Sequence, residues 1–147
     1  MNASKEISIH DNTLVSYEVL CNRREIRLHT EFRDRGEPYE FTDIMFTGVV
    51  AYDFRYDSEI GTIIFEITDV PASDIYEQQV DQFQAGIRYG WPGEWAKSSQ
   101  DAADYFAKNS VCGYILSSSC GMNGWILARS KEIRPTTNRN DWSENLS

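Results

Sequence analysis

The sequence predicts an α+β fold: a mainly antiparallel β-sheet meander with one amphipathic helix and one short helix packed on it. Apolar and polar residues alternate through much of the first seventy positions, which is typical of strands with one solvated face. The apolar spacing then becomes helical, at Tyr76, Val80, Phe83 and Ile87. With 147 residues, 41% of them hydrophobic, the chain is long and apolar enough for one core. We therefore expect a single domain over residues 1–134.

The first two strands are expected to form a hairpin. Thr13–Leu20 is rich in β-forming residues, and Cys21–Arg23 supplies a polar turn. After the turn, Ile26 and Leu28 alternate with charged side chains and with His29. This alternation places His29 on the solvated face of its strand.

The next apolar stretch, Phe41–Tyr56, is interrupted by Gly48 after a loop at residues 34–38. Glycine inside a strand pattern commonly marks a bulge, so this stretch is either one long bent strand or two short ones. A turn at residues 57–61 leads to Thr62–Ile67, which is almost continuously apolar and is expected in the centre of the sheet.

The amphipathic helix is expected after Pro71, a residue that suits a first helical turn. Its polar faces carry Asp74, Glu77 and Asp81, and acids near a helix start favour the positive end of the helix dipole. Gly90, Pro92 and Gly93 then break regular structure. The short helix is expected to begin after Ser98, where Ser98–Asp101 resembles a capping box, and to end near Lys108.

The last predicted elements are two strands, Val111–Leu116 and Trp125–Ala128, joined by a longer loop at residues 117–124. From Pro135 onward the sequence is polar except for Trp142. We expect residues 135–147 to be a disordered tail.

The charge of the chain limits its partners. The formal net charge is −9, and residues 56–87 contain seven acidic residues and no Lys or Arg. Such a surface repels phosphate, which disfavours nucleic acid and anionic membranes and favours a basic protein. No apolar run is long enough for a membrane span or has the form of a signal peptide, so the expected location is the cytoplasm.

Residues suited to catalysis are few. His10 and His29 are the only histidines, and the neighbouring His10 and Asp11 favour a turn over a catalytic pair because adjacent side chains of an extended chain point apart. Three cysteines without a CxxC pair are expected to be buried and reduced. Cys120 is the best candidate nucleophile among them, but an acidic surrounding would raise the pKa of its thiol. We predict no catalytic residue, no cofactor and no metal site.

An aromatic loop follows the acidic helix and contains Trp91 and Trp95. The two indoles either cap the core from the loop or, if exposed, provide the rigid anchors that dominate protein interfaces. In the second case they form one patch together with the acidic helix.

Several segments of the chain resemble small bacterial immunity proteins, which bind and neutralise one cognate toxin, and the resemblance covers about residues 8–134. The segments are His10–Asn12, Ile26–Glu31, Phe46–Val49, Ile63–Ile67 and Ser117–Ala128. They are turn and core residues, so the resemblance implies no site residues. It implies a partner that is a toxin, and toxins that cut nucleic acid are commonly basic because they hold phosphate.

The first functional hypothesis is therefore a non-enzymatic, acidic protein-binding module, an immunity protein that neutralises a basic, nuclease-type toxin. Its alternatives are a small-molecule-binding or enzymatic α+β domain, with a pocket lined by Tyr52, Phe54, Tyr76 and Phe83, and a subunit of a permanent complex. The predicted partner-binding residues are Asp57, Glu59, Asp69, Asp74, Glu77, Asp81, Trp91 and Trp95.

Overall fold

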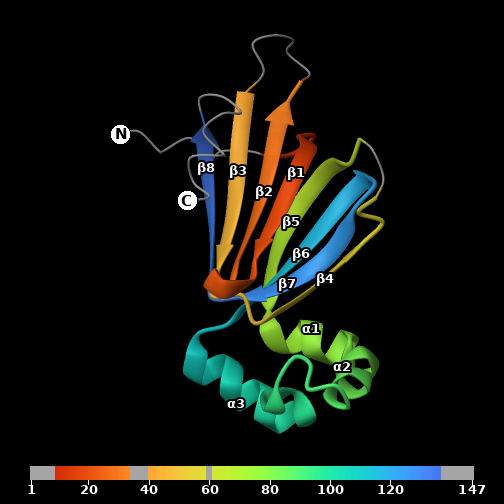
Figure 1. The fold of residues 1–147 in the computed structure, drawn as a ribbon, viewed down its shortest axis with the longest axis vertical. Coiled ribbons are helices and arrows are strands. Elements are labelled where there is room, and N and C mark those ends of the chain that lie inside the picture. Colours follow the sequence, from red (N-terminus) through yellow and green to blue (C-terminus); the bar gives the residue numbers. More distant parts are fainter. Residues whose placement is uncertain (1–8, 34–39, 59–60, 137–147) are drawn as a thin grey trace.

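The computed structural model describes residues 9–33, 40–58 and 61–136 as eight strands, three α-helices and two short 3-10 helices (Figure 1). The strands are β1 Thr13–Leu20, β2 Glu25–Phe32, β3 Glu40–Thr47, β4 Ala51–Arg55, β5 Ile63–Pro71, β6 Cys112–Cys120, β7 Asn123–Ala128 and β8 Ser130–Thr136. The helices are α1 Ala72–Gln78, α2 Val80–Ile87 and α3 Ser99–Asn109, with 3-10 turns η1 at Cys21–Arg23 and η2 at Glu94–Lys97.

All eight strands belong to one antiparallel sheet in the order β4-β7-β6-β5-β1-β2-β3-β8. The predicted hairpin of β1 and β2 is confirmed, and so is the antiparallel α+β class. Consecutive strands are neighbours, as in the predicted meander, from β1 to β3 and again from β5 to β7, which includes the predicted hairpin of β6 and β7. Strand β4 leaves its predecessor to pair with β7, and β5 lies between β1 and β6.

The departure of β4 is caused by a corner at Gly48. This residue has φ +64°, a left-handed conformation that glycine adopts without strain. The paired segment β7–β8 bends at the same place. The backbone N–H of Arg129, between β7 and β8, donates to the carbonyls of Thr47 and Gly48 at 3.0 and 3.2 Å. Two bent strands thus stay paired around the corner, β3 with β8 before it and β4 with β7 after it.

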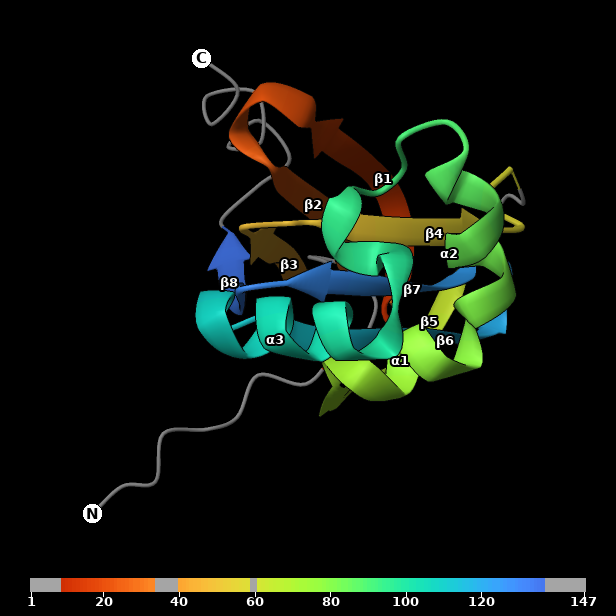
Figure 2. The same cartoon turned by 90° about the horizontal axis from the view of Figure 1, so that it is seen from below.

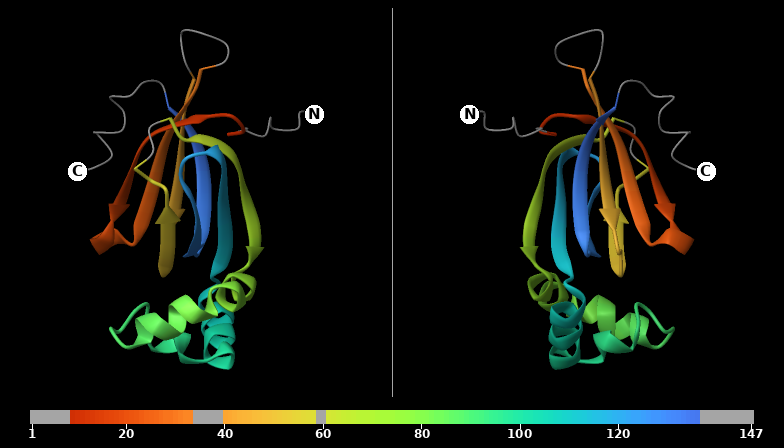
Figure 3. Two further views of the ribbon diagram at one scale, coloured as in Figure 1. Left: turned by 90° about the vertical axis from the view of Figure 1, so that its right-hand side faces the viewer. Right: turned by 90° about the vertical axis from the view of Figure 1, so that its left-hand side faces the viewer.

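The sheet is strongly twisted and curved. In the view of Figure 1 its strands spread apart away from the helices, whereas in the side views of Figure 3 they spread apart toward the helices. The two halves of the sheet are joined where β1 pairs with β5 at Thr13 and Ile63. Apolar side chains of both halves fill the space between them, with Leu28, Phe46 and Ile126 almost fully buried.

The helices form a second layer at one end of the sheet, over β4 and β7 (Figure 2). A second core joins them to the sheet through Tyr76, Phe83 and Phe106 from the helices and Trp125 and Leu127 from β7. Alternation along β7 produces this division, since Ile126 faces the first core while its neighbours face the second.

The predicted helices are present with one correction. The amphipathic helix is divided into α1 and α2 at Gln79, whose φ of −111° and ψ of 22° are not helical, so there are three α-helices instead of two. The start of α3 is as predicted, because the Ser98 hydroxyl accepts a hydrogen bond from the backbone N–H of Asp101 at 3.1 Å.

The C-terminal strands differ most from expectation. Strands β6 and β7 extend through most of the predicted loop, so that the connection shortens to Gly121 and Met122. Strand β8 was not predicted, and it includes Pro135, which was assigned to the tail. An edge strand tolerates proline because one side of its backbone needs no partner strand. Residues 137–147 lie outside the described part of the chain.

Candidate functional site

Three of the predicted acidic residues lie on the two helices that follow β5. Asp74 and Glu77 belong to α1 and Asp81 to α2, and all three side chains are exposed. Within the described residues, no Lys, Arg or His nitrogen lies within 4.0 Å of their carboxylates. We call Asp74, Glu77 and Asp81 the helical acids. They present unpaired negative charge on elements held in place by a buried aromatic core.

The remaining predicted acids are arranged differently. Asp57 follows β4 and accepts a hydrogen bond of 2.5 Å from the Tyr17 hydroxyl, and this bond, with burial, raises the pKa of Tyr17 to about 12. Asp69 on β5 pairs with Lys131 Nζ of β8 at 3.1 Å. Glu59 lies outside the described residues. Asp57 and Asp69 therefore have internal partners that the helical acids lack.

The tryptophans of the aromatic loop pack against the helical core. The Trp91 ring stacks on Phe83 with a centroid distance of 5.2 Å and an interplanar angle of 8°. The Trp95 ring stacks on Tyr105 at 5.0 Å and 10°. Both indoles are only half-buried, so the same rings that cap the core also reach the surface.

A cleft of about 370 Å³ lies between the helices and the outer face of β4, β7 and β6. Its floor contains a cross-strand row of Asp53, Trp125 and Ile115, side chains that share one face because they lie directly opposite each other. Its wall is formed by α1 residues and Gln79. The α1 residues are Ile75 and Gln78, and the rest of the lining consists of Arg55, Tyr56, Leu116, Ser117, Asn123 and Gly124.

This cleft is not the pocket that was predicted between sheet and helix. Tyr76 and Phe83 are fully buried in the helical core, Phe54 packs against the core of the sheet and Tyr52 is exposed. The prediction of that lining was wrong because it assumed that apolar side chains face a cavity. They fill the space between the layers instead.

Asp53 is the charged group on the cleft floor. Its Oδ2 atom accepts hydrogen bonds from Gln82 Nε2 and from Arg55 Nε, both at 3.1 Å. Two polar atoms near it, Gln82 Oε1 and Trp125 Nε1, are buried and have no hydrogen-bond partner within the described part of the chain. Buried polar groups are nearly always paired, so this unpaired acceptor and this unpaired donor are exceptions in the packing around Asp53.

Sequence reasoning missed Asp53, Gln82 and Trp125. Asp53 alternates with Tyr52 and Phe54, so the pattern indicated that its side chain lies on the opposite face of the strand from these two aromatic residues. The pattern did not indicate which strand lies beside it. The pairing of Asp53 with Trp125 joins residues 72 positions apart and arises only from the corner at Gly48.

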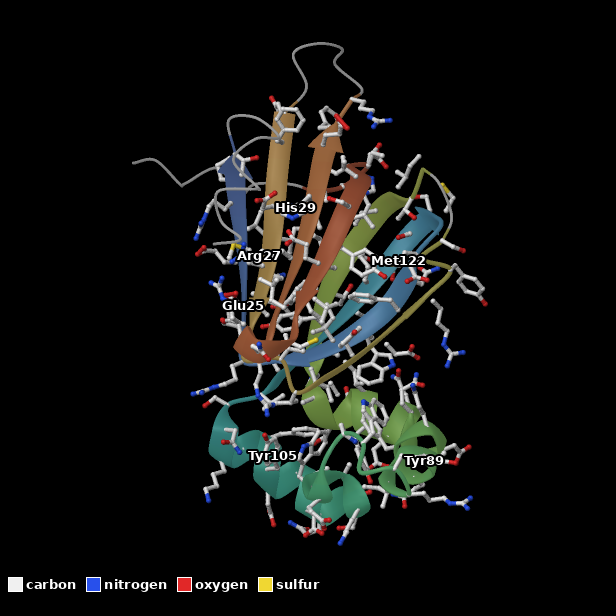
Figure 4. The ribbon with its side chains drawn as sticks, in the orientation of Figure 1. Glu25, Arg27, His29, Tyr89, Tyr105 and Met122 are labelled. Carbon is white, nitrogen blue, oxygen red and sulfur yellow. The ribbon has the colours of Figure 1, made fainter. Side chains whose placement is uncertain are left out.

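His29 was predicted to be solvated, and this is wrong: only 2% of the residue is exposed. Its Nδ1 lies 3.0 Å from Asp43 Oδ1, and its Nε2 bonds to Glu18 Oε1. Burial by itself lowers the pKa of His29, but the hydrogen bonds to Asp43 and Glu18 outweigh it and raise the pKa. Figure 4 shows His29 in the half of the sheet that lies away from the helical layer.

The turn expected at His10 and Asp11 is confirmed, since Asp11 has φ 67°. The assumption that the two side chains point apart is wrong, because the turn brings Nε2 of His10 to 3.5 Å from Oδ2 of Asp11. The expectation for the cysteines is also corrected. Cys21, Cys112 and Cys120 are all exposed instead of buried. Each lies at an end of a strand or in a turn, where the side chain does not enter a core.

A comparison with known protein families, curated proteins and solved structures found no match for this chain. In the ranges that the structure describes, no three His, Cys, Asp or Glu side chains are grouped as a metal site. The same ranges contain no helix with the length and apolar character needed to cross a membrane. The helical acids, the aromatic loop and the cleft are the features of the described residues that bear on function.

Proposed function

We propose that this protein is a non-enzymatic binding protein that uses the helical acids to recognise a basic partner protein. The observation that carries the proposal is the exposure of Asp74, Glu77 and Asp81, whose carboxylates have no cationic partner within the described residues. A carboxylate that is already paired must lose that pair before it binds a new cation. The helical acids have no such pair to lose within the described residues, so their charge acts fully on an approaching partner.

Exposed tyrosines near these elements support a protein interface. Tyr89 follows α2 and is 85% exposed, and Tyr56 follows β4 and is 69% exposed. Figure 4 shows Tyr89 at the outer side of the helical layer. Tyrosine is enriched at interfaces because it offers a large rigid contact area together with a hydroxyl group. The acids thus provide attraction, and the tyrosines provide area to bury.

The rigidity of the helical layer favours tight binding. Phe83 of α2 is fully buried and stacks on Tyr76 of α1, with 5.0 Å between ring centroids. The Tyr76 hydroxyl also donates to the carbonyl of Ala96 at 2.8 Å, which connects α1 to the aromatic loop. A surface that is ordered before binding loses little conformational entropy when the partner arrives.

The non-enzymatic part of the proposal is supported by the state of His29. Both of its ring nitrogens are engaged by carboxylates, so neither is available to take a proton from a substrate. Within the class of binding proteins, an immunity protein against a basic, nuclease-type toxin fits the acidic surface best. Its action is to cover the basic surface with which such a toxin holds phosphate.

The test compares two triple variants with the same change of charge. Asp74→Lys, Glu77→Lys and Asp81→Lys together reverse the helical acids, and the matched control replaces Glu66, Asp104 and Glu132 by Lys. Both variants move the formal net charge from −9 to −3. The partner is captured from the source cells with the wild-type protein, purified, and measured for association rate against all three proteins at low and high salt.

We expect a basic partner whose association with the wild-type protein slows as salt rises. The helical variant is expected to associate more slowly by on the order of tenfold or more at low salt, and the control variant much less. Equal effects of the two variants would contradict the assignment to α1 and α2. An acidic or neutral partner would contradict the charge argument. For an immunity protein, expression of the partner alone must harm the source cells and co-expression must restore growth.

A further inference from the structure

Strand β4 lies at an edge of the sheet and has the properties of a dimerisation strand. We infer that it pairs antiparallel with β4 of a second copy of this chain, around a twofold axis at Phe54. The inference goes beyond the proposed function, because it uses neither the helical acids nor a basic partner. The two proposals therefore stand or fall separately.

The first argument is that β4 has a neighbouring strand on one side only. Within the described residues it pairs with β7 and stands at the end of the strand order (Figure 2). In an edge strand, every second residue directs its backbone N–H and C=O groups away from the sheet. A groove of about 220 Å³ lies beside the start of β4, where Ala51 and Tyr52 line it together with residues at the end of β1. The backbone groups of this edge thus have open space beside them.

The two edges of the sheet differ in how they are protected. Strand β8 carries Lys131 and Pro135. Both residues hinder an edge strand from pairing with another chain, because the ammonium group must keep its water and proline has no N–H group to donate. Strand β4 reads Ala-Tyr-Asp-Phe-Arg and contains neither residue. Of the two edges, β4 is therefore the one suited to pairing.

The charges of β4 favour a second copy in one register. When two copies pair about Phe54, Asp53 of each lies directly opposite Arg55 of the other, which gives two ion pairs. A pairing centred one residue earlier places two copies of Asp53 opposite each other. A pairing centred one residue later does the same with Arg55. Both of these registers bring like charges together, so the pattern is self-complementary only about Phe54.

The ion pair within one copy leaves capacity for the second copy. Arg55 Nε and Gln82 Nε2 both donate to Oδ2 of Asp53 at 3.1 Å. Within the described residues, Asp53 Oδ1 accepts no hydrogen bond and the terminal nitrogens of Arg55 donate none. Of the two side chains, 22% of Asp53 and 64% of Arg55 are exposed. Guanidinium has five N–H donors, so Arg55 can keep its own Asp53 and also bind that of the second copy.

Aromatic side chains occupy the other face of β4. Tyr52 and Phe54 lie on this face, with 5.1 Å between their ring centroids. Tyr52 is 36% exposed and Phe54 is half-buried. At the proposed axis Phe54 lies opposite its own copy, and aromatic cross-strand pairs stabilise antiparallel strands. The dimer thus combines ion pairs on one face with aromatic contacts on the other.

The experiment is sedimentation velocity of the full-length chain. Each copy has a net charge of −9, so the measurement is made at about 0.15 M salt, where a Debye length of about 8 Å screens the charges far from the interface. Asp53→Arg brings arginine opposite arginine across the axis, and Arg55→Asp brings aspartate opposite aspartate. We expect each single variant to dimerise more weakly than the wild type by on the order of tenfold or more.

An equimolar mixture of the two single variants tests the register. We expect it to form a heterodimer, because every arginine in the mixed pair lies opposite an aspartate. The matched control is the double variant Asp53→Arg with Arg55→Asp, which exchanges the two charges within one chain. It is expected to dimerise like the wild type. Circular dichroism and urea unfolding establish that each variant is folded.

Three results would overturn the inference: a wild-type chain that stays monomeric up to about 100 μM, single variants that dimerise like the wild type, or folded single variants whose mixture stays monomeric. Hydrogen exchange of the wild-type protein gives a check without substitutions. Backbone amides of β4 should exchange more slowly above the dimerisation concentration than below it. Unchanged exchange across Ala51–Arg55 would show that a dimer forms through another surface.

Discussion

The hydroxyl of Tyr76 is expected to stabilise the whole helical layer. It donates to the carbonyl of Ala96 at 2.8 Å and accepts from Gln84 Nε2 at 3.2 Å, while Tyr76 and Ala96 are almost fully buried. In Tyr76→Phe the ring remains and the donor is lost. Among the side chains that the structure describes, the Ala96 carbonyl then retains only Gln84 Nε2 at 3.4 Å, a long contact. The variant therefore leaves a buried acceptor poorly satisfied, which is the costly kind of hydrogen-bond deletion.

The expected loss of unfolding free energy is about 2 kcal/mol, the sum of about 1 kcal/mol for the bond itself and a similar amount for the buried carbonyl. For a chain of 147 residues this corresponds to a fall in melting temperature of about 6 °C. The matched control is Tyr105→Phe, because the Tyr105 hydroxyl makes no hydrogen bond within the described residues. We expect its stability to stay within about 0.5 kcal/mol of the wild-type value.

Urea unfolding followed by tryptophan fluorescence measures both variants. The midpoint should fall for Tyr76→Phe with an unchanged slope, since the same surface is exposed on unfolding. If the two variants have the same midpoint, the hydroxyl does not hold the aromatic loop, and the argument that this loop is ordered before binding fails.

Three further predictions concern the rest of the fold. Because the pKa of His29 is raised in the folded state, protonated His29 stabilises the fold at pH values below its unfolded pKa of about 6.5. This stability is lost as the pH rises through the folded pKa. Urea midpoints at pH 6 and pH 8 should therefore differ more for the wild type than for His29→Gln. Phe83→Leu should lower the unfolding free energy by about 2 kcal/mol, because it removes stacked aromatic pairs as well as packing. A loss of unfolding free energy below a quarter of that value in urea unfolding would contradict the role of these pairs. Gly48→Ala should lower the thermal stability of the protein more than Gly61→Ala. Both glycines have positive φ, but of the two only Gly48 has a neighbour that an added methyl group would meet, the Arg129 side chain at 2.7 Å.

Local structure was predictable wherever it depends on neighbours in the sequence. The alternation around Ile26 and Leu28 indicated β2, and the first core contains both residues. The cap at Ser98 indicated the start of α3 because its hydrogen bond joins residues three positions apart. The helical acids were identified for the same reason, since charge that lies between the apolar positions of a helix faces solvent.

The candidate site was predictable only in part. The aromatic loop and the helical acids were found because each lies within one short segment. The cleft was not found, because its floor combines β4, β7 and β6, and pairing partners in a sheet leave no local pattern. The burial of His29 was missed for a similar reason. A strand face that carries alternating charged residues is normally exposed to solvent. Here Glu18 and Asp43, on the two neighbouring strands, bond to His29 and bury it.

The sequence by itself determined the class of the fold, the positions of most strands and helices, and the surplus of negative charge, because these depend on composition and on periods of two and of 3.6 residues. Tertiary structure alone decided that β4 turns away at Gly48, that β8 completes the sheet, and that Asp53 and Trp125 share a cleft. These features depend on contacts between distant segments. Their free energy is set by which surfaces are buried together, and that information appears only when the chain is folded.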